Sequence, residues 1–363
     1  MRPLILAIYS VAILACGCAM AQPVRVLNVF NWSDYIDPKL LDDFEKETSI
    51  KVVYDTYDSN EALEAKLISG GAGFDLVFPS ATFLVRQISS KLVQPIDRSR
   101  LRNREKISKE LDQRLETYDP GARHSIVYMW FTTGLAINEE KVKARLGDLD
   151  VNTWDLVLNR DLLRKVSDCG VYFLDSAEDV FAIALWRNGL SIERSSASDL
   201  SKVSAQLTRL RPYIRKFHSS EYISALASGD ACVALGWAGD SFQAQARAQE
   251  AGNGNKIIYK IPKEGTIMSM DVIAIPKDAK NVSEAYEFID FLLRPEVAAK
   301  NTNLTKFANG VPESYPLVAP EIAQNPHIFP KEQQEGKLFL VGPLAPAVQR
   351  SITREWTRVK TGR

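Results

Sequence analysis

Residues 24–38 read VRVLNVFNWSDYIDP, a run in which an apolar segment leads into a cluster of polar and aromatic side chains. The first seven residues, through Phe30, are rich in Val and Leu and predict a buried strand. Asp37 and Pro38 predict the N-cap and the first position of a helix. Because ligands bind at the carboxyl ends of strands in open α/β sheets, this strand-to-helix corner is a candidate binding site.

The corner carries an indole, a hydroxyl, a carboxylate and a phenol in four consecutive residues, Trp32, Ser33, Asp34 and Tyr35. Such a group suits a small organic cation, because the carboxylate neutralises the charge and the rings cover the apolar part of the ligand. An Asx turn beside two half-buried aromatic side chains would explain the same residues without a ligand. The corner by itself leaves both interpretations open.

The first 21 residues predict a secretory signal peptide, with a basic start, an apolar run and small residues before a cleavage site after Ala21. The apolar run is too short to span a membrane, and no later segment approaches its length. A lipoprotein-type site before Cys16 is the alternative. We favour cleavage after Ala21, because cleavage before Cys16 would leave a second odd cysteine, Cys18. The mature chain is therefore expected outside the cytoplasm.

Composition narrows the choice of partners. The full chain has 45 basic and 45 acidic residues, and loss of Arg2 with the signal peptide leaves a net charge of about −1, which argues against nucleic acid or anionic membrane as a partner. A mature chain of about 340 residues predicts two domains. Its two remaining cysteines, Cys169 and Cys232, favour a disulfide over a redox or metal site in an oxidising compartment.

Apolar, β-branched runs alternate with helical patterns along the chain, which is typical of the α/β class. The predicted helices are Pro38–Glu47, Ser59–Ser69 with Asp58 as N-cap, and Val282–Leu293. No long linker divides the sequence, so we expect two lobes between which the chain crosses more than once through strand-like hinges. The predicted strands are Val24–Phe30, Ile50–Tyr54, Phe74–Pro79, Ile126–Met129, Gly134–Ile137, Gly170–Leu174, Cys232–Gly236, Lys256–Ile261 and Asp271–Ile275.

Three further acids extend the cationic hypothesis. Trp237 and Asp240 follow a predicted strand and repeat the chemistry of the first corner, although an Asx turn would also explain Asp240. Asp271 adjoins a buried strand, where a lone carboxylate is costly unless it is paired. Asp179 fits a capping box with Ser176 as N-cap. A diamine needs acids at both ends and rings along its methylenes, and two Trp–Asp corners favour a shared site of that kind.

Catalytic and metal chemistry have few candidates. His124, His218 and His327 are far apart in sequence, and no Gly-x-Ser-x-Gly nucleophile elbow occurs. We expect no cofactor and no metal. An exported hydrolase with paired carboxylates is the rival from another class, and it would show turnover. A receptor for a sugar or an amino acid is a third reading, but an amino-acid receptor should offer an Arg, which these motifs lack.

Several motifs resemble those of the polyamine-binding proteins of bacterial ABC importers, and the resemblance covers nearly all of the mature chain. The putrescine-specific branch is the most similar, through Cys169-Gly170-Val171 and residues 261–265, Ile-Pro-Lys-Glu-Gly. The other motifs are residues 31–36 (NWSDYI), 44–48 (FEKET), 74–80 (FDLVFPS), 128–134 (YMWFTTG), 217–220 (FHSS), 236–240 (GWAGD) and 356–360 (WTRVK).

This resemblance implies a type II periplasmic binding protein fold, in which two α/β lobes joined by crossing hinge strands enclose a ligand cleft. The implied lobes are residues 22–130 with 262–307, and 131–261 with 308–363. It also implies a Cys169–Cys232 disulfide, a periplasmic location, a monomer, and delivery of ligand to a membrane permease. The implied ligand contacts are Trp32, Ser33, Asp34, Tyr35, Ser80, Asp179, Ser219, Trp237, Asp240 and Asp271.

The chain departs from the family pattern at three places. Ser269 and Met270 precede the late aspartate, where the family has an aromatic residue, and Phe307 replaces a pocket tyrosine. Asp179 stands where a glutamate is expected, one methylene shorter. These changes leave open the choice between putrescine, cadaverine, agmatine and spermidine. A sensor that reports ligand occupancy to a regulator is a further alternative to transport.

Overall fold

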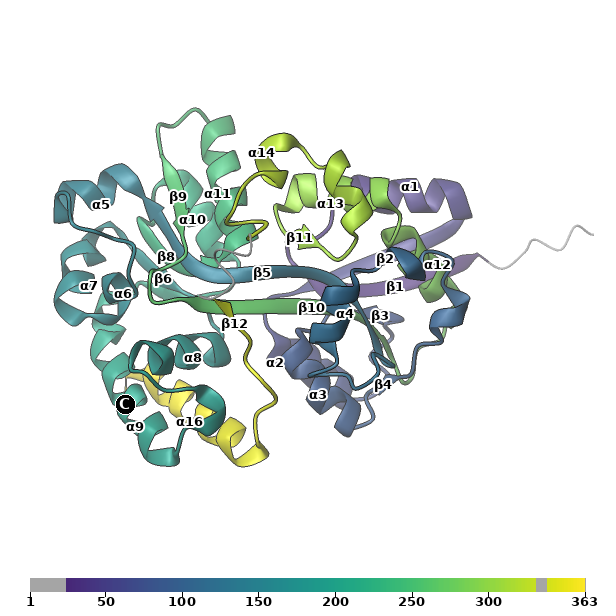
Figure 1. Ribbon diagram of the computed structural model, residues 1–363, viewed down its shortest axis with the longest axis horizontal. Coiled ribbons are helices and arrows are strands. Elements are labelled where there is room, and N and C mark those ends of the chain that lie inside the picture. Colours follow the sequence, from purple (N-terminus) through teal and green to yellow (C-terminus); the bar gives the residue numbers. More distant parts are fainter. Residues whose placement is uncertain (1–23, 331–337, 363) are drawn as a thin grey trace, which may run out of the picture.

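The computed structural model describes residues 24–330 and 338–362, so the predicted signal peptide and Cys16 lie outside the described residues. Two lobes lie side by side, and two long strands run across both of them (Figure 1). Within the described ranges, no helix is long and apolar enough to cross a membrane. The architecture is the predicted two-lobe α/β fold.

One sheet continues through both lobes in the order β2-β1-β3-β10-β5-β8-β6-β7, with four short strands attached at its sides. Strands β1, β2 and β3 are parallel, as are β6, β7 and β8. Strands β5 and β10 are antiparallel to their neighbours in this order, although β10 also pairs in parallel with the short strand β12. The strands are β1 (Arg25–Trp32), β2 (Ile50–Tyr57), β3 (Leu76–Val77), β4 (Val93–Gln94), β5 (Ser125–Asn138), β6 (Val171–Phe173), β7 (Lys216–Phe217), β8 (Val233–Trp237), β9 (Ile257–Lys260), β10 (Thr266–Pro276), β11 (Ala308–Asn309) and β12 (Leu338–Phe339).

Helices cover the sheet in both lobes (Figure 1). The α-helices of the first lobe and of the return segment are α1 (Pro38–Thr48), α2 (Asn60–Ile68), α3 (Ala81–Ser89), α4 (Lys109–Leu115), α12 (Val282–Leu292), α13 (Pro295–Thr305) and α14 (Pro320–Ala323). Those of the second lobe are α5 (Glu139–Leu146), α6 (Asp155–Leu158), α7 (Arg160–Val166), α8 (Ala177–Arg187), α9 (Ala197–Leu210), α10 (Glu221–Ser228), α11 (Ala238–Glu250) and α16 (Pro346–Thr361).

The predicted start of α1 is confirmed, because Asp37 is its N-cap and accepts a hydrogen bond from the Lys39 amide at 3.0 Å. The predicted cap of α2 is wrong. Ser59, not Asp58, caps that helix and accepts from the Ala62 amide. The Asp58 carboxylate is thereby free to face the other lobe.

The two strands that cross between the lobes are longer than predicted. Ile126–Met129 and Gly134–Ile137 belong to one strand, β5, because the residues between them pair with β10 and β8. Gly134 does not break it: a side chain there would lie 2.5 Å from the Tyr259 hydroxyl, so a glycine is required for close packing. In β10, Asp271 lies mid-strand beside a register shift, and not at the strand's start.

Two large hydrophobic cores divide the chain. One contains residues from Leu27 to Phe131 and from Met268 to Val311, and the other contains residues from Leu135 to Ile267 and from Val341 to Val359. A smaller cluster joins α11 and β9 to α13 and α14. We propose the lobe division given above, with two differences at its edges. Ile267 packs in the second core, and residues 308–328 pack against both lobes, with Val311 in the first core.

The Cys169–Cys232 disulfide is present, with its Cα atoms 5.5 Å apart. The two cysteines lie just before β6 and β8, which are neighbours in the sheet. The bond closes a loop with a sequence separation of 63 residues and therefore restricts the unfolded chain, an effect of about 2–5 kcal/mol in secreted domains.

Asp75 joins three segments of the first lobe. Its buried carboxylate accepts five hydrogen bonds, from the backbone amides of Asn28, Lys280 and Asn281 and from the side-chain amides of the two asparagines, at 2.9–3.0 Å. Burial alone would raise the pKa of Asp75, but the hydrogen bonds from Asn281 and Asn28 hold it below its ordinary value. The ionised carboxylate therefore holds the start of α12 to β1.

We expect Asp75→Ala to lower the free energy of unfolding by about 2–4 kcal/mol, because it leaves several buried N–H groups without acceptors. Urea unfolding followed by circular dichroism measures the change. Asp43→Ala is the control, since Asp43 only forms an exposed pair with Lys300. Equal stability of the two variants would contradict this role for Asp75.

Candidate functional site: an acidic interlobe cleft

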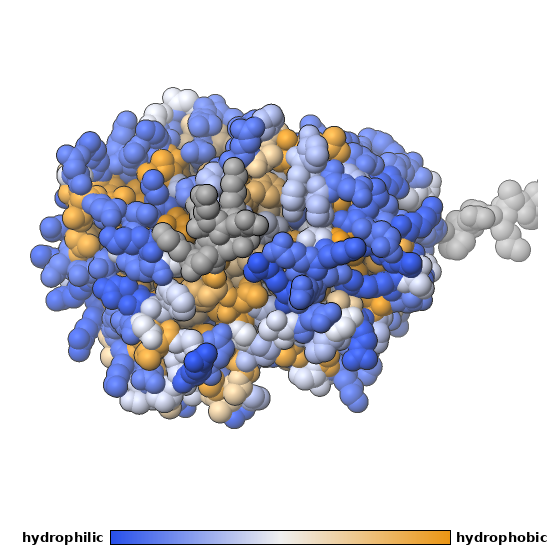
Figure 2. Space-filling model, in the orientation of Figure 1, coloured by the Kyte–Doolittle hydropathy of each residue, from blue (hydrophilic) through white to orange (hydrophobic). Residues whose placement is uncertain are grey.

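Two adjoining cavities occupy the space between the lobes, with volumes of about 640 and 370 Å³ including their open mouths. In Figure 2 the lower edge of the molecule is notched where the lobes meet, and hydrophobic residues gather above the notch. We call the smaller, which reaches Asp240 and Asp271, the inner cavity, and the larger, which reaches Glu178, the outer cavity. They form one cleft because they share Trp32, Asp58, Ser80, Phe131, Ser219 and Trp237.

Trp32 forms a fixed wall of the cleft on the first lobe. Its indole N–H donates to the Phe78 carbonyl at 2.8 Å, and the Tyr57 hydroxyl donates to the same oxygen at 2.6 Å. The Trp32 and Tyr57 rings also pack together, with centroids 4.7 Å apart. The indole NH is thus satisfied by the protein, which leaves the ring surface for apolar or cationic contact with a ligand.

Asp271 is the buried acid of the first lobe, with 3% of its surface exposed. Ser80, at the start of α3, donates its hydroxyl hydrogen to Asp271 at 2.7 Å. Burial raises the pKa of Asp271 to about 7, and the hydrogen bond from Ser80 partly opposes that shift. Beside it, the Tyr35 hydroxyl lines the inner cavity and is buried without a hydrogen-bond partner among the described residues.

Asp240 is the corresponding acid of the second lobe. It lies in the first turn of α11, directly after Trp237 at the end of β8. The Tyr222 hydroxyl donates to the Asp240 carboxylate at 2.7 Å and accepts from the Trp237 amide at 3.0 Å. Burial raises the pKa of Asp240 to about 7. The predicted Trp–Asp corner is therefore a compact unit facing the cleft.

The two tryptophans meet across the cleft, with ring centroids 5.7 Å apart and the rings nearly perpendicular. Phe131 of β5 packs against Trp237 and against Phe307, at 5.9 and 5.2 Å. These rings make the central part of the cleft apolar. On either side of them lie the acids of the inner cavity and those of the outer cavity.

The glycines of the motif at residues 236–240 are explained by close contacts. A side chain at Gly236 would lie 2.6 Å from the Tyr222 ring, and one at Gly239 would lie 2.2 Å from the Phe307 ring. Each glycine therefore lets an aromatic side chain approach the strand-to-helix corner.

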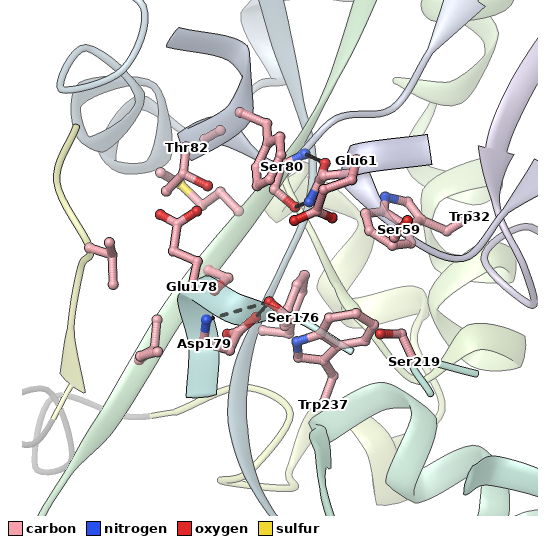
Figure 3. Close-up of a pocket in the computed structure, with 18 of the residues that line it drawn as sticks. Trp32, Ser59, Glu61, Ser80, Thr82, Ser176, Glu178, Asp179, Ser219 and Trp237 are labelled. Carbon is pink, nitrogen blue, oxygen red and sulfur yellow. Dashed lines mark hydrogen bonds between the residues drawn. The ribbon is translucent and has the colours of Figure 1, made fainter. Parts of the chain in front are cut away.

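Helix α8 supplies the acids of the outer cavity. Figure 3 shows Glu178 and Asp179 on one wall, opposite Ser80, Thr82 and Glu61. Asp179 accepts from the Ser176 hydroxyl at 2.5 Å and from the Thr133 hydroxyl at 3.0 Å. Ser176 is the N-cap of α8, as predicted, so Asp179 belongs both to the cap and to the cleft. Burial raises the pKa of Asp179, and burial together with Asp179 raises the pKa of Glu178 to about 8.

Asp34 is the one predicted contact residue that lines neither cavity. It has a left-handed backbone conformation with φ of 56°, and its carboxylate pairs with Arg247 of α11 at 2.7 Å. The Asp34 carbonyl also accepts from Gln243 of α11 at 3.2 Å. Asp34 therefore contacts the opposite lobe instead of the cleft interior. The other nine predicted residues all line the cleft.

Sequence reasoning missed several lining residues. Asp58 and Tyr57 follow the same pattern as Trp32, a strand end that leads into a helix, and that signal could have identified them. Glu178 adjoins Asp179 and was available in the same motif. Tyr222 does not line the cleft but hydrogen-bonds to Asp240. It had no signal in the sequence, because only the fold brings the two residues together.

The ionisable side chains that line the cleft are acidic. Seven carboxyl groups line the cleft, and none of the described lining residues is Lys, Arg or His. The acids are Asp58, Glu61, Asp175, Glu178, Asp179, Asp240 and Asp271. Across the described part of the chain, no group of three or more His, Cys, Asp or Glu side chains is arranged to hold a metal ion. The cleft is therefore built for an organic cation with apolar segments.

A two-lobe fold with a ligand cleft between crossing strands defines a solute-binding protein. The family model described as bacterial extracellular solute-binding protein matches residues 39–330. The chain belongs to this family, whose members bind solutes, and it is not an enzyme.

Named relatives agree with this assignment. The chain is 45% identical to a putrescine-binding periplasmic protein of Pseudomonas aeruginosa, over 96% of this chain and 95% of the relative. It is 46% identical to a putrescine-binding periplasmic protein of Escherichia coli, over 95% and 94% of the two chains. A solved structure described as a putative spermidine/putrescine ABC transporter from Listeria monocytogenes superimposes with a TM-score of 0.82 at 28% identity, covering 93% of this chain and all of that one.

We expect Gly239→Ala to lower the free energy of unfolding by about 1–3 kcal/mol, because the added methyl group collides with Phe307. Guanidinium unfolding measures the loss. In the double variant, Phe307→Leu should restore part of the lost stability, because the smaller leucine side chain leaves room for the methyl group added at residue 239. Gly342→Ala is the matched control, with its nearest atoms at 3.6 Å. An unchanged free energy of unfolding in the Gly239→Ala variant would contradict the close packing of this corner.

Proposed function

We propose that this protein is an extracytoplasmic receptor that captures a polyamine, with putrescine favoured, and delivers it to the permease of an ABC importer. The observation that carries the proposal is a cleft lined by seven carboxyl groups and several aromatic rings, with no cationic side chain among the described lining residues. The names of the two putrescine-binding relatives support the same ligand class.

A diamine fits this arrangement of charges. One ammonium group would bind at Asp240, and the other near Asp271 and Asp179, with hydroxyl groups of Ser80 and Ser219 at hand. An ammonium that leaves water loses several kcal/mol of hydration, so more than one acid is needed. Methylenes packed on the tryptophan rings contribute about 0.8 kcal/mol each, and cation–π contact adds about 0.5–2 kcal/mol.

Binding would favour the closed arrangement of the lobes, because the ligand contacts both lobes only when they are together. Direct contacts assist closure. Asp34 pairs with Arg247, and the Ser220 hydroxyl donates to Asp58 at 2.9 Å, in each case across the lobes. The closed receptor is then the form presented to the permease.

The outer cavity favours longer ligands as a second candidate class. Glu61 and Glu178 line it and form no ion pair within the described residues. Ser269, where the family has an aromatic residue, also lines it and leaves space. A third ammonium group, as in spermidine, or the guanidinium of agmatine would find acids there.

The remaining parts of the proposal concern the chain's location and partners. Residues 1–21 serve as a signal peptide that directs the protein to the periplasm, where the two putrescine-binding relatives are located by name. Retention by a lipid at Cys16 is the alternative. We propose that the receptor acts as a monomer and serves transport and not sensing; adjacent genes for a permease and an ATPase would support transport.

Calorimetric titration of purified, ligand-stripped protein with putrescine, cadaverine, agmatine and spermidine tests the ligand class. We expect one-to-one binding, tightest for putrescine if the inner cavity dominates and for spermidine if the outer acids contribute. Asp240→Asn should weaken binding by orders of magnitude while the melting temperature stays similar. Absence of heat with all four ligands would overturn the proposal, and unchanged affinity in Asp240→Asn would refute the role of that acid.

The raised pKa values make binding pH-dependent. Burial raises the pKa of Asp240 and of Asp271 to about 7, and a bound ammonium would favour their ionised forms. Affinity should therefore fall as pH drops below about 7, by roughly tenfold per pH unit for each carboxyl group that must lose a proton. Titrations between pH 5.5 and 8.5 check this, and Asp240→Asn should show a shallower dependence. A flat profile for the unmodified protein would contradict it.

A further inference from the structure

Tyr222 lies on α10, behind the cleft, and lines neither cavity. We propose that Tyr222 is a positioning residue for ligand binding, whose hydroxyl stabilises the ionised Asp240 carboxylate and keeps it aimed into the cleft. The proposal rests on the proposed function, since it assumes that Asp240 binds the cation.

The hydrogen-bond geometry fixes the role of the hydroxyl. The Trp237 amide can only donate, so the Tyr222 oxygen accepts that bond at 3.0 Å. The single hydroxyl hydrogen is then left for the Asp240 carboxylate at 2.7 Å. A donor held in this way stabilises the charged form of an acid more than its neutral form.

The surroundings leave the hydroxyl little freedom to turn elsewhere. Tyr222 is completely buried, and its ring packs directly over Gly236, where any side chain would collide with it. The phenol therefore reaches the corner between β8 and α11 only because residue 236 is a glycine.

Tyr222 also connects two separate parts of the cleft wall. Helix α10 follows Ser219, which lines the cleft, and Ser220, which contacts Asp58 of the other lobe. The hydroxyl of Tyr222 ties this segment to the corner that carries Trp237 and Asp240. The second lobe's contribution to the site is thereby held as one rigid unit.

Other charged or titratable groups act on Asp240 from the neighbouring elements. Asp34 and Asp271 disfavour its ionised form, and Arg247 of α11 favours it, but Arg247 is engaged with Asp34 at 2.7 Å. The phenol of Tyr35 also lies within electrostatic reach of Asp240. Tyr222 is the one side chain among the described residues that hydrogen-bonds directly to Asp240.

Tyr222→Phe tests the proposal by calorimetric titration with putrescine. We expect the dissociation constant at pH 7 to rise about 10- to 100-fold, the range for loss of a hydrogen bond to a charged group. The fall in affinity at low pH should also begin at a higher pH, because Asp240 loses a group that favours its ionised form. In an Asp240→Asn background, the same substitution should change affinity by less than about twofold.

Tyr286→Phe is the matched control. Its buried hydroxyl also accepts a hydrogen bond from a backbone amide, that of Asp97, at 2.6 Å. Tyr286, however, lies in the first lobe, away from the cleft. The Tyr286→Phe variant should change the free energy of unfolding without changing how putrescine affinity depends on pH. If Tyr222→Phe fails to fold, Gly236→Ala displaces the tyrosine while retaining it, and the same shift of the pH profile is expected.

Two results would overturn the proposal: an unchanged pH profile in a folded Tyr222→Phe variant, or an equal loss of affinity with and without Asp240. Failure of the proposed function is a distinct outcome, since the unmodified protein would then bind no polyamine at all.

Discussion

The pairing of β5 with β10 is the constraint on which the rest of the structure depends. These antiparallel strands carry the chain from one lobe to the other and back, and their register sets Phe131 opposite Ser269 and Met129 opposite Asp271. The floor of the cleft is therefore part of the hinge. A shift of this register by one residue would turn Asp271 to the other face of the sheet, so hinge and site cannot vary independently.

The carboxyl groups that line the cleft are energetically unfavourable in the absence of a bound cation. Several carboxyl groups share a space with no cationic side chain among its described lining residues, and of the seven acids only Asp175 is paired, with Lys360. Burial makes Glu178, Asp240 and Asp271 harder to ionise. Hydroxyl donors such as Ser80 and Thr133 offset part of that cost. A bound cation offsets the rest of this unfavourable free energy. The uncompensated negative charge of the cleft therefore contributes to its selectivity for cations.

Sequence reasoning reached the fold class, the disulfide and nine of the cleft-lining residues. These succeeded because strand ends, caps and motifs are local signals, as at Trp32, Ser176 and Trp237. It could not show what a long-range partner decides. Asp34 stays a predicted ligand contact, but nothing in the sequence indicated that its carboxylate pairs with Arg247, 213 residues later. β5 was predicted as two strands, Ile126–Met129 and Gly134–Ile137, because the pairing of residues 130–133 with β10 and β8 is not visible in the sequence. Tyr222 has the same explanation, since only the folded chain brings its hydroxyl to Asp240.

The pair formed by Asp34 and Arg247 differs in one physical respect from the acids inside the cleft. Both of its side chains are more than a third exposed to water, so dissolved ions screen their attraction, whereas the enclosed carboxyl groups are screened much less. Ionic strength therefore acts mainly on the contact between the lobes, and acidity acts mainly on the cleft. Two properties of the surrounding solution thus act on the protein through two separate groups of residues.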